Sequence, residues 1–320
     1  MFSGPNPVFL LCTAKAMEDF QKLVPTKIDR WGHQIKHFGR IASGAVDQIK
    51  SSTEWKKRRD AILHTIGINL SSRYIPMVIE KLDVLSESWK EDEFINFSHE
   101  ITSLTFDIIT MILFGKDVRT KIGQINYTRT NGQIVQYDLM YYFHELVEDL
   151  EITSFQPINK AFPFLEAYEL TVAHKALKSN IENLWSVLLD YLNHSDDKES
   201  VYHKIMSKFQ SSNFTDVKNV VYDAKLVLMD MITFYIAGYD PISHALCSLL
   251  YNIKKNDHVF NKLSEEITEK YHIKDKHDYK SIRNTLDAFE YLPLVIKEAL
   301  RFDNPAYFSL GYQALEDVTI

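Results

Sequence analysis

Cysteine is almost absent from this chain of 320 residues, which contains only Cys12 and Cys247. Two cysteines so far apart form neither a disulfide framework nor a Cys-x-x-Cys metal site, and this usage fits a reducing compartment. The histidines lack ligand spacing, and His144-Glu145 is followed at position 148 by a glutamate, which excludes an HExxH zinc motif. The sequence therefore predicts no metal centre held by its own side chains alone.

Glycine and proline are also scarce, at 10 and 9 residues, which favours long helices over a turn-rich β fold. With 45% hydrophobic and 12% aromatic residues, the chain can bury a sizeable core. It contains no internal repeat, low-complexity segment or convincing linker. We therefore predict a mainly α fold, organised as one large or two modest domains.

Long blocks of one charge sign are missing, although the net charge is −7. This pattern indicates no nucleic acid or other polyanion as a partner, and the local exception is the basic run Lys56–Arg59. No run of about twenty apolar residues is free of charge, and Met1–Pro5 has no basic n-region. We expect no signal or transmembrane segment in this sequence, so any membrane association would need other segments and the localisation is left open.

The most informative stretch, residues 215–255, has a wide apolar face and predicts one long core helix. Pro241 interrupts it, because proline has no N–H and its ring crowds the carbonyl of Ala237. Gly238 costs about 1 kcal/mol relative to alanine in a helix interior. The pattern predicts a kink with a free carbonyl beside the Asp240 carboxylate, and an ordinary proline kink in a buried helix explains the same residues.

Two further helices carry pairs of side chains that share a face. Ser51-Ser52-Thr53 predicts a helix start, after which Trp55 and Arg59 lie at i and i+4 and can reach the same object. A solvated basic helix start with a packed tryptophan is the alternative interpretation.

The second of these helices is predicted over residues 291–303, with Glu298 and Arg301 at i and i+3. The pair is either an ordinary surface ion pair or a buried pair that needs further partners to offset desolvation.

The motif Ala237-Gly238-x-Asp240, followed about sixty residues later by Glu298-x-x-Arg301, resembles the oxygen-binding helix and the Glu-x-x-Arg helix of the cytochromes P450, the haem-thiolate monooxygenases. The segments NIKKNDHVFNKLSEEI and YLPLVIKEALRFDNP strengthen the likeness, which covers roughly residues 7–320. The resemblance implies a single, incomplete domain over residues 1–320 with the mainly α cytochrome P450 fold, truncated, with a small β component at both ends. The N-terminal membrane helix and first strand of the family's eukaryotic members are missing here.

The resemblance also implies roles for the residues named above. Trp55 and Arg59 would hold the haem propionates, for which an arginine fork is suited. Ala237 and Gly238 would form the oxygen groove and Asp240 would assist proton delivery, whereas Glu298 and Arg301 would be structural.

The complete enzyme implied by the family inserts one atom of O₂ into an apolar organic substrate. Its electrons come from NADPH through a reductase, and family members commonly sit on the cytoplasmic face of the endoplasmic reticulum membrane. Helices in the family's central region roof the substrate pocket and vary most in sequence, so the substrate cannot be read from them.

This sequence departs from the family pattern at the residues that matter most for chemistry. Pro241 stands where the family usually has a threonine, which predicts altered oxygen activation. The Phe-x-x-Gly-x-x-x-Cys loop that supplies the axial thiolate is not in the sequence, and neither Cys12 nor Cys247 fits that role. The second arginine of the Glu-x-x-Arg network would lie beyond Ile320.

These departures lead us to expect a chain that is inactive or incomplete by itself. The alternative from another class is a non-catalytic helical pseudoenzyme that binds an apolar ligand or a partner.

The remaining secondary structure follows from apolar periodicity and helix signals. We predict a short buried strand over residues 8–12 and a polar loop over 120–133. The predicted helices span residues 13–23, 73–89, 97–115, 136–151, 164–192 and 258–272.

Overall fold

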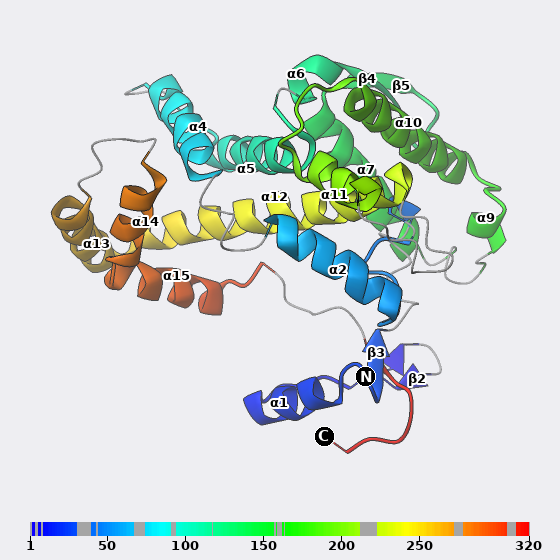
Figure 1. Ribbon diagram of the computed structural model, residues 1–320, viewed down its shortest axis with the longest axis horizontal. Coiled ribbons are helices and arrows are strands. Elements are labelled where there is room, and N and C mark those ends of the chain that lie inside the picture. Colours follow the sequence, from blue (N-terminus) through cyan, green and yellow to red (C-terminus); the bar gives the residue numbers. More distant parts are fainter. Residues whose placement is uncertain are drawn as a thin grey trace.

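The computed structural model describes residues 2–3, 6–7, 9–30, 40–42, 44–66, 74–90, 94–116, 118–156, 158, 162, 164–211, 223–271, 278–305 and 312–319. Over these residues the protein is mainly α, with small two-stranded sheets, as predicted (Figure 1). The helices are α1 Ala14–Leu23, α2 Thr53–Ile66, α4 Ile75–Ser88, α5 Phe97–Phe114, α6 Val118–Ile122, α7 Leu139–Phe155, α9 Phe164–Ala167, α10 Val172–His194, α11 Val201–Ser211, α12 Ala224–Lys255, α13 Asp257–Lys270, α14 Tyr279–Asp287 and α15 Tyr291–Phe302. The strands are β1 Phe2–Ser3, β2 Asn6–Pro7, β3 Ile28–Arg30, β4 Ile125–Thr128, β5 Ile134–Tyr137 and β6 Tyr312–Ala314.

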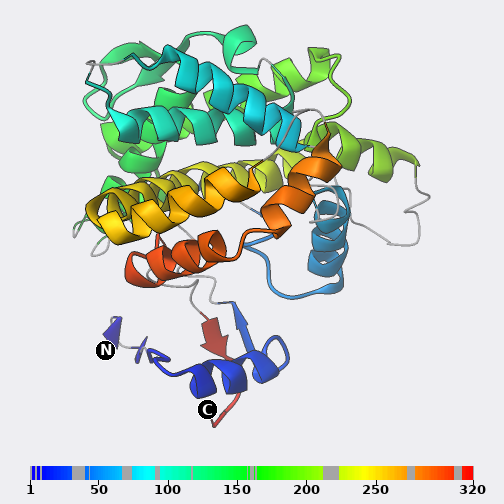
Figure 2. The ribbon, with the colours of Figure 1, turned by 90° about the vertical axis from the view of Figure 1, so that its left-hand side faces the viewer.

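Helix α12 crosses the middle of the molecule in both views (Figures 1 and 2). It starts at Ala224, because the Asp223 backbone is extended and its carboxylate accepts a hydrogen bond from the Leu226 N–H at 2.9 Å. The predicted start at residue 215 is therefore wrong, and residues 215–222 lie outside the described part. Pro241 lies inside the helix without ending it.

The most extensive helix packing among the described residues joins α12 to α5. Gly238 allows it: a Cβ at this position would lie 2.7 Å from the Cδ1 and Cγ1 atoms of Ile109 on α5. Nearby, the buried Tyr235 ring packs against Phe106 and Phe143, with centroid distances of 5.0 and 4.2 Å. Helix α5 is long and apolar enough to cross a membrane by length and composition, but core helices of soluble proteins pass the same test.

The core lies between α5, α7, α10, α11 and the N-terminal half of α12. On the C-terminal half of α12 the burial is lower than the apolar pattern suggested. Leu250 and Tyr251 are 41% and 64% exposed in the described part of the chain.

A β-hairpin replaces most of the predicted polar loop over residues 120–133. Strands β4 and β5 pair antiparallel, with Ile125 opposite Tyr137, so the β structure is not confined to the two ends of the chain. The alternating pattern of β4 buries Ile125 and Tyr127, and the Tyr127 hydroxyl donates to Asp149 on α7 at 2.6 Å. Strand β4 has only four residues, so its alternating pattern could not be recognised in the sequence beside the polar residues that follow it.

The strand predicted over residues 8–12 is also wrong for residues 9–12, which the structure describes. Phe9 is 83% exposed and residues 9–12 form no strand, while residue 8 lies outside the description. The N-terminal part of the chain instead forms strand β3, which was not predicted. Strand β3 pairs antiparallel with β6 and so brings the N-terminal and C-terminal parts of the chain together (Figure 1).

The helix predicted over residues 164–192 is two helices, α9 and α10. Glu169 adopts a positive φ of 53°, and Thr171 caps α10 by accepting a hydrogen bond from the His174 N–H. Helices α11 and α14 were not predicted. The helices predicted over 13–23, 97–115, 258–272 and 291–303 are confirmed to within two residues at each end.

Candidate functional site

Helix α2 presents the first pair of predicted site residues. It begins as predicted, because the Ser52 hydroxyl accepts a hydrogen bond from the Trp55 N–H at 3.1 Å. The guanidinium carbon of Arg59 lies 5.6 Å from the Trp55 ring centroid, and the Arg59 side chain is 51% exposed. The structure thus brings Trp55 and Arg59 together, and the half-exposed Arg59 guanidinium also lies 3.8 Å from the Asp60 carboxylate.

Arg30, at the end of β3, is a neighbour of Trp55 that the sequence analysis missed. Its guanidinium carbon lies 4.7 Å from the ring centroid, a cation–π distance. Arg30 also donates to the carbonyl of Ile49 at 2.8 Å, and its neighbour Asp29 accepts from the N–H and hydroxyl of Ser51. Strand β3 therefore holds the loop that leads into α2.

Arg58 corrects the interpretation of Lys56–Arg59 as a local basic surface. Its side chain is 2% exposed and binds Asp230 of α12, which is fully buried. Nη2 and Nε of Arg58 donate to the two carboxylate oxygens of Asp230 at 2.6 and 3.2 Å. A lone aspartate within the apolar run LVLMDMI of α12 is the sequence signal that could have revealed this pair.

The Ala237-Gly238-x-Asp240 motif divides between two faces of α12. Ala237 and Asp240 are exposed, whereas Gly238 faces Ile109 on α5. One turn later Ser243 is 4% exposed and its hydroxyl donates to the backbone carbonyl of Asp240 at 2.8 Å. Ala237 and Asp240 therefore share an open face, and Gly238 has a packing role that the motif alone did not indicate.

Glu298 and Arg301 on α15 form a bidentate ion pair with bond lengths of 2.7 and 2.8 Å. Their side chains are 65% and 69% exposed, so within the described residues they form the surface pair that the spacing allowed. The hydrogen bonds from Arg301 lower the pKa of the Glu298 carboxyl.

Glu266 on α13 is a second carboxylate that the sequence analysis missed. It accepts backbone hydrogen bonds from Glu290, Tyr291 and Leu292 at 2.7, 2.8 and 2.9 Å, and so caps the free N–H groups where α15 begins. Burial opposes its ionisation, but these donors outweigh the burial and lower the pKa of Glu266 to about 2. The Glu-x-x-Arg helix is thus fixed at its N-terminus by a charge from α13.

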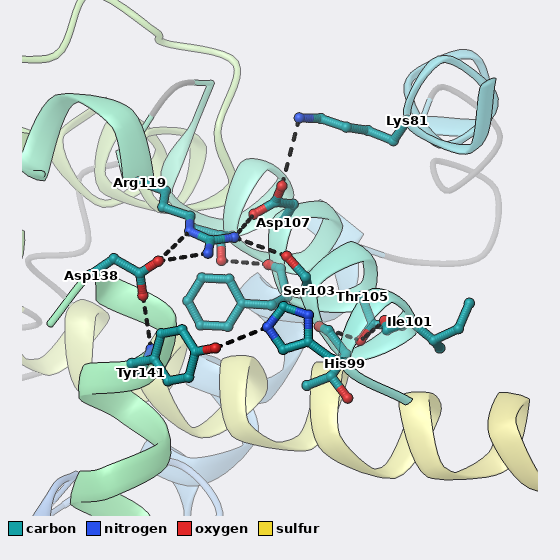
Figure 3. A network of polar contacts seen from close by, with 12 residues as sticks. Lys81, His99, Ile101, Ser103, Thr105, Asp107, Arg119, Asp138 and Tyr141 are labelled. Carbon is teal, nitrogen blue, oxygen red and sulfur yellow. Dashed lines mark hydrogen bonds and ion pairs between the residues drawn. The ribbon is translucent and has the colours of Figure 1, made fainter. Parts of the chain in front are cut away.

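Arg119 on α6 is the centre of another polar network, which contains none of the predicted site residues (Figure 3). Its guanidinium binds Asp138 at 2.6 Å, Asp107 at 3.0 Å and the hydroxyl of Ser103 at 3.1 Å. Lys81 of α4 lies 3.8 Å from Asp107, so the network joins α4, α5, α6 and the start of α7.

The two cysteines do not resemble thiolate ligands. Cys12 is exposed ahead of α1, and Cys247 lies half-buried on α12, where burial raises the pKa of its thiol. A raised pKa disfavours the thiolate that binds a metal. Among the described residues, no group of three or more His, Cys, Asp or Glu side chains is arranged to hold a metal ion.

The sequence profile of the cytochrome P450 family matches residues 2–320. The chain belongs to the cytochrome P450 family. Cytochrome P450 3A12 of Canis lupus familiaris is 22% identical over 265 residues, covering 79% of this chain and 49% of that protein. Cytochrome P450 3A2 of Rattus norvegicus is 21% identical over 318 residues, covering 94% of this chain and 58% of the relative. Cytochrome P450 71BT1 of Catharanthus roseus is 24% identical over 242 residues, covering 71% and 43%.

Family membership confirms the resemblance inferred from the two motifs. The chain spans about half the length of the cytochrome P450 relatives it matches. The match therefore establishes the family and the fold class, while the roles of individual residues remain predictions.

Proposed function

We propose that this chain forms the part of a haem-dependent monooxygenase that holds the haem propionates and lines the oxygen-binding side of the haem. The observation that supports this most directly is the pairing of Trp55 with a half-exposed Arg59 on α2, in a cytochrome P450 chain whose α12 exposes Ala237 and Asp240. Haem, when bound, would supply the oxygen chemistry of the family.

The side chains on these two helices would contact the group in different ways. The Arg59 guanidinium would bind a propionate carboxylate through two parallel hydrogen bonds, and Trp55 would pack beside it. The small, exposed side chain of Ala237 would leave room for the group beside α12. The exposed Asp240 carboxylate would hold a proton and pass it on through water. Neither Cys12 nor Cys247 is assigned as an axial ligand.

Pro241 makes altered oxygen use part of this proposal. A proline supplies no hydroxyl and no N–H, and the nearby Ser243 hydroxyl already donates to the Asp240 carbonyl. We expect oxygen to be released as peroxide more often than when a threonine follows the acidic residue. In the haem-loaded enzyme, Pro241→Thr should lower the peroxide formed per O₂ consumed, and an unchanged ratio would refute this expectation.

The proposed substrate is an apolar small molecule, and the proposed electron source is NADPH through a reductase partner. Both follow from the family and not from any residue of this chain, as does a position on the cytoplasmic face of the endoplasmic reticulum membrane.

Titration of the purified chain with haemin tests the haem part of the proposal, and the carbon monoxide spectrum after reduction tests the ligand. Saturable uptake that depends on Arg59 supports haem binding on the α2 face. A thiolate-type Soret band would show that one of the cysteines does ligate iron, against our assignment. Weak, featureless uptake would favour the alternative of a non-catalytic protein that binds an apolar ligand or a partner.

A further inference from the structure

The buried ion pair between Arg58 and Asp230 ties α2 to α12 at a defined distance. Besides its two bonds to Asp230, Arg58 donates through Nη1 to the carbonyl of Gly44 at 2.8 Å. Asp230 Oδ1 also accepts a hydrogen bond from the Val46 N–H at 2.6 Å. One guanidinium and one carboxylate thus join two helices and the loop before α2.

The pair lies within one or two turns of the residues of the proposed haem site on both helices, although on α2 the buried Arg58 and the half-exposed Arg59 point in different directions. Asp230 precedes Ala237 by about two helical turns, or about 10 Å, so the two residues share one face of α12. On α2, Arg58 follows Trp55 by three positions and directly precedes Arg59, so it leaves from the same turn as the proposed propionate contacts.

We propose that the Arg58–Asp230 pair is a positioning device that fixes the spacing between the propionate-holding face of α2 and the oxygen-side face of α12. This inference rests on the proposed function, because it assigns the two faces to opposite parts of one haem. Arg58 and Asp230 touch neither the ligand nor the reacting atoms, and they act by placing Trp55 and Ala237.

The geometry of the pair matters more for this role than its charge. A buried ion pair returns little net stability, because desolvation of both ions offsets their attraction, but removal of one partner leaves an uncompensated charge. Arg58→Lys keeps the positive charge as a single ammonium, which cannot bond both Asp230 oxygens and the Gly44 carbonyl in the fixed geometry of a guanidinium. This substitution therefore separates the fixed spacing from the charge.

Arg119→Lys is the matched control. Arg119 also binds two carboxylates, Asp107 and Asp138, and links separate helices, but its network lies on α5, α6 and α7 (Figure 3). A general loss of stability would affect both variants, whereas a loss of the α2–α12 spacing should follow only from Arg58→Lys.

The spacing can be measured without haem. Nitroxide labels at Lys56→Cys on α2 and Tyr251→Cys on α12, in the full chain with Cys12 and Cys247 replaced by serine, report the distance between the helices by pulsed electron paramagnetic resonance. We expect a narrow distance distribution that broadens or shifts in Arg58→Lys and is unchanged in Arg119→Lys. An unchanged distribution in Arg58→Lys would overturn the proposal.

Haemin titration of the same variants connects the spacing to the site. We expect Arg58→Lys to weaken haemin binding by roughly tenfold, the scale of one displaced contact, and Arg119→Lys to change it less than about twofold. If Arg58→Lys and the wild type bind haemin with equal affinity, the positioning role is refuted but the proposed haem site is not. Failure of the wild-type chain to bind haemin would instead refute the proposed haem site, and this inference with it.

Discussion

Gly238 offers a direct test of the packing that places α12. In the family pattern it belongs to the oxygen groove, but in this structure it lies where α12 meets α5. An alanine Cβ there would lie 2.7 Å from Cδ1 and Cγ1 of Ile109, closer than atoms in contact can approach. Either Ile109 or one of the helices would have to move.

Two opposing effects set the size of the change in Gly238→Ala. Alanine is favoured over glycine in a helix interior by about 1 kcal/mol. Insertion of a methyl group into a packed interface costs about 1–3 kcal/mol. We therefore expect the free energy of unfolding, measured by urea denaturation of the full chain, to fall by about 0–2 kcal/mol.

The same substitution in an Ile109→Ala variant should change the free energy of unfolding in the opposite direction, which makes the test decisive. Ile109→Ala removes the two clashing atoms and leaves only Cβ, which is 3.5 Å from the added methyl group. In that background Gly238→Ala should stabilise the protein by about 1 kcal/mol, the helix-propensity term alone. The same change in both backgrounds, or a stabilisation of that size in the wild type, would refute the close approach of α12 to α5.

Three further changes test other parts of the structure. Because the pKa of Glu266 is lowered from 4.5 to about 2, its stabilising effect is complete above pH 4.5 and is lost as the pH falls toward 2; the acid-side decline in Tm should be smaller in Glu266→Gln, and a parallel decline would contradict the cap. Glu298→Ala should leave Tm nearly unchanged, since the pair is exposed in this chain, so a large fall would show that the Glu-x-x-Arg pair has unseen structural partners. Pro241→Ala restores the N–H that can bond the Ala237 carbonyl and should raise the free energy of unfolding by up to about 3 kcal/mol, and a decrease would mean that the proline fits its site better than a regular helix does.

The fold class and the long helices could be predicted because their signals are local. The apolar periodicity of α5 and α12 and the caps at Thr13 and Ser52 act within one or two turns. Strand β3 could not be predicted, since its three residues are stabilised by pairing with β6, which lies nearly three hundred residues away in the sequence. A strand that depends on a partner so far away leaves no local pattern in the sequence.

The candidate site shows the same division. The spacing of Trp55 and Arg59 on one helix was enough to place them together. Arg58 looked like another solvated cation of a basic run, because its partner Asp230 is far away in the sequence. Likewise, nothing local indicated that Gly238 lets two helices touch, and only the position of Ile109 reveals this packing role, while the predicted role in the oxygen groove stays a prediction.

Haemin titration of the full chain, wild type against Arg59→Ala, tests the central claim most directly. We expect saturable binding of one haemin in the wild type, accompanied by quenching of tryptophan fluorescence that is smaller in Trp55→Phe, because Trp55 is one of four tryptophans in the chain. We also expect that Arg59→Ala weakens this binding by about tenfold, as expected for loss of one charge-assisted contact. Uptake that does not saturate, or that is the same in Arg59→Ala as in the wild type, would contradict the assignment of α2 as the helix that holds the haem.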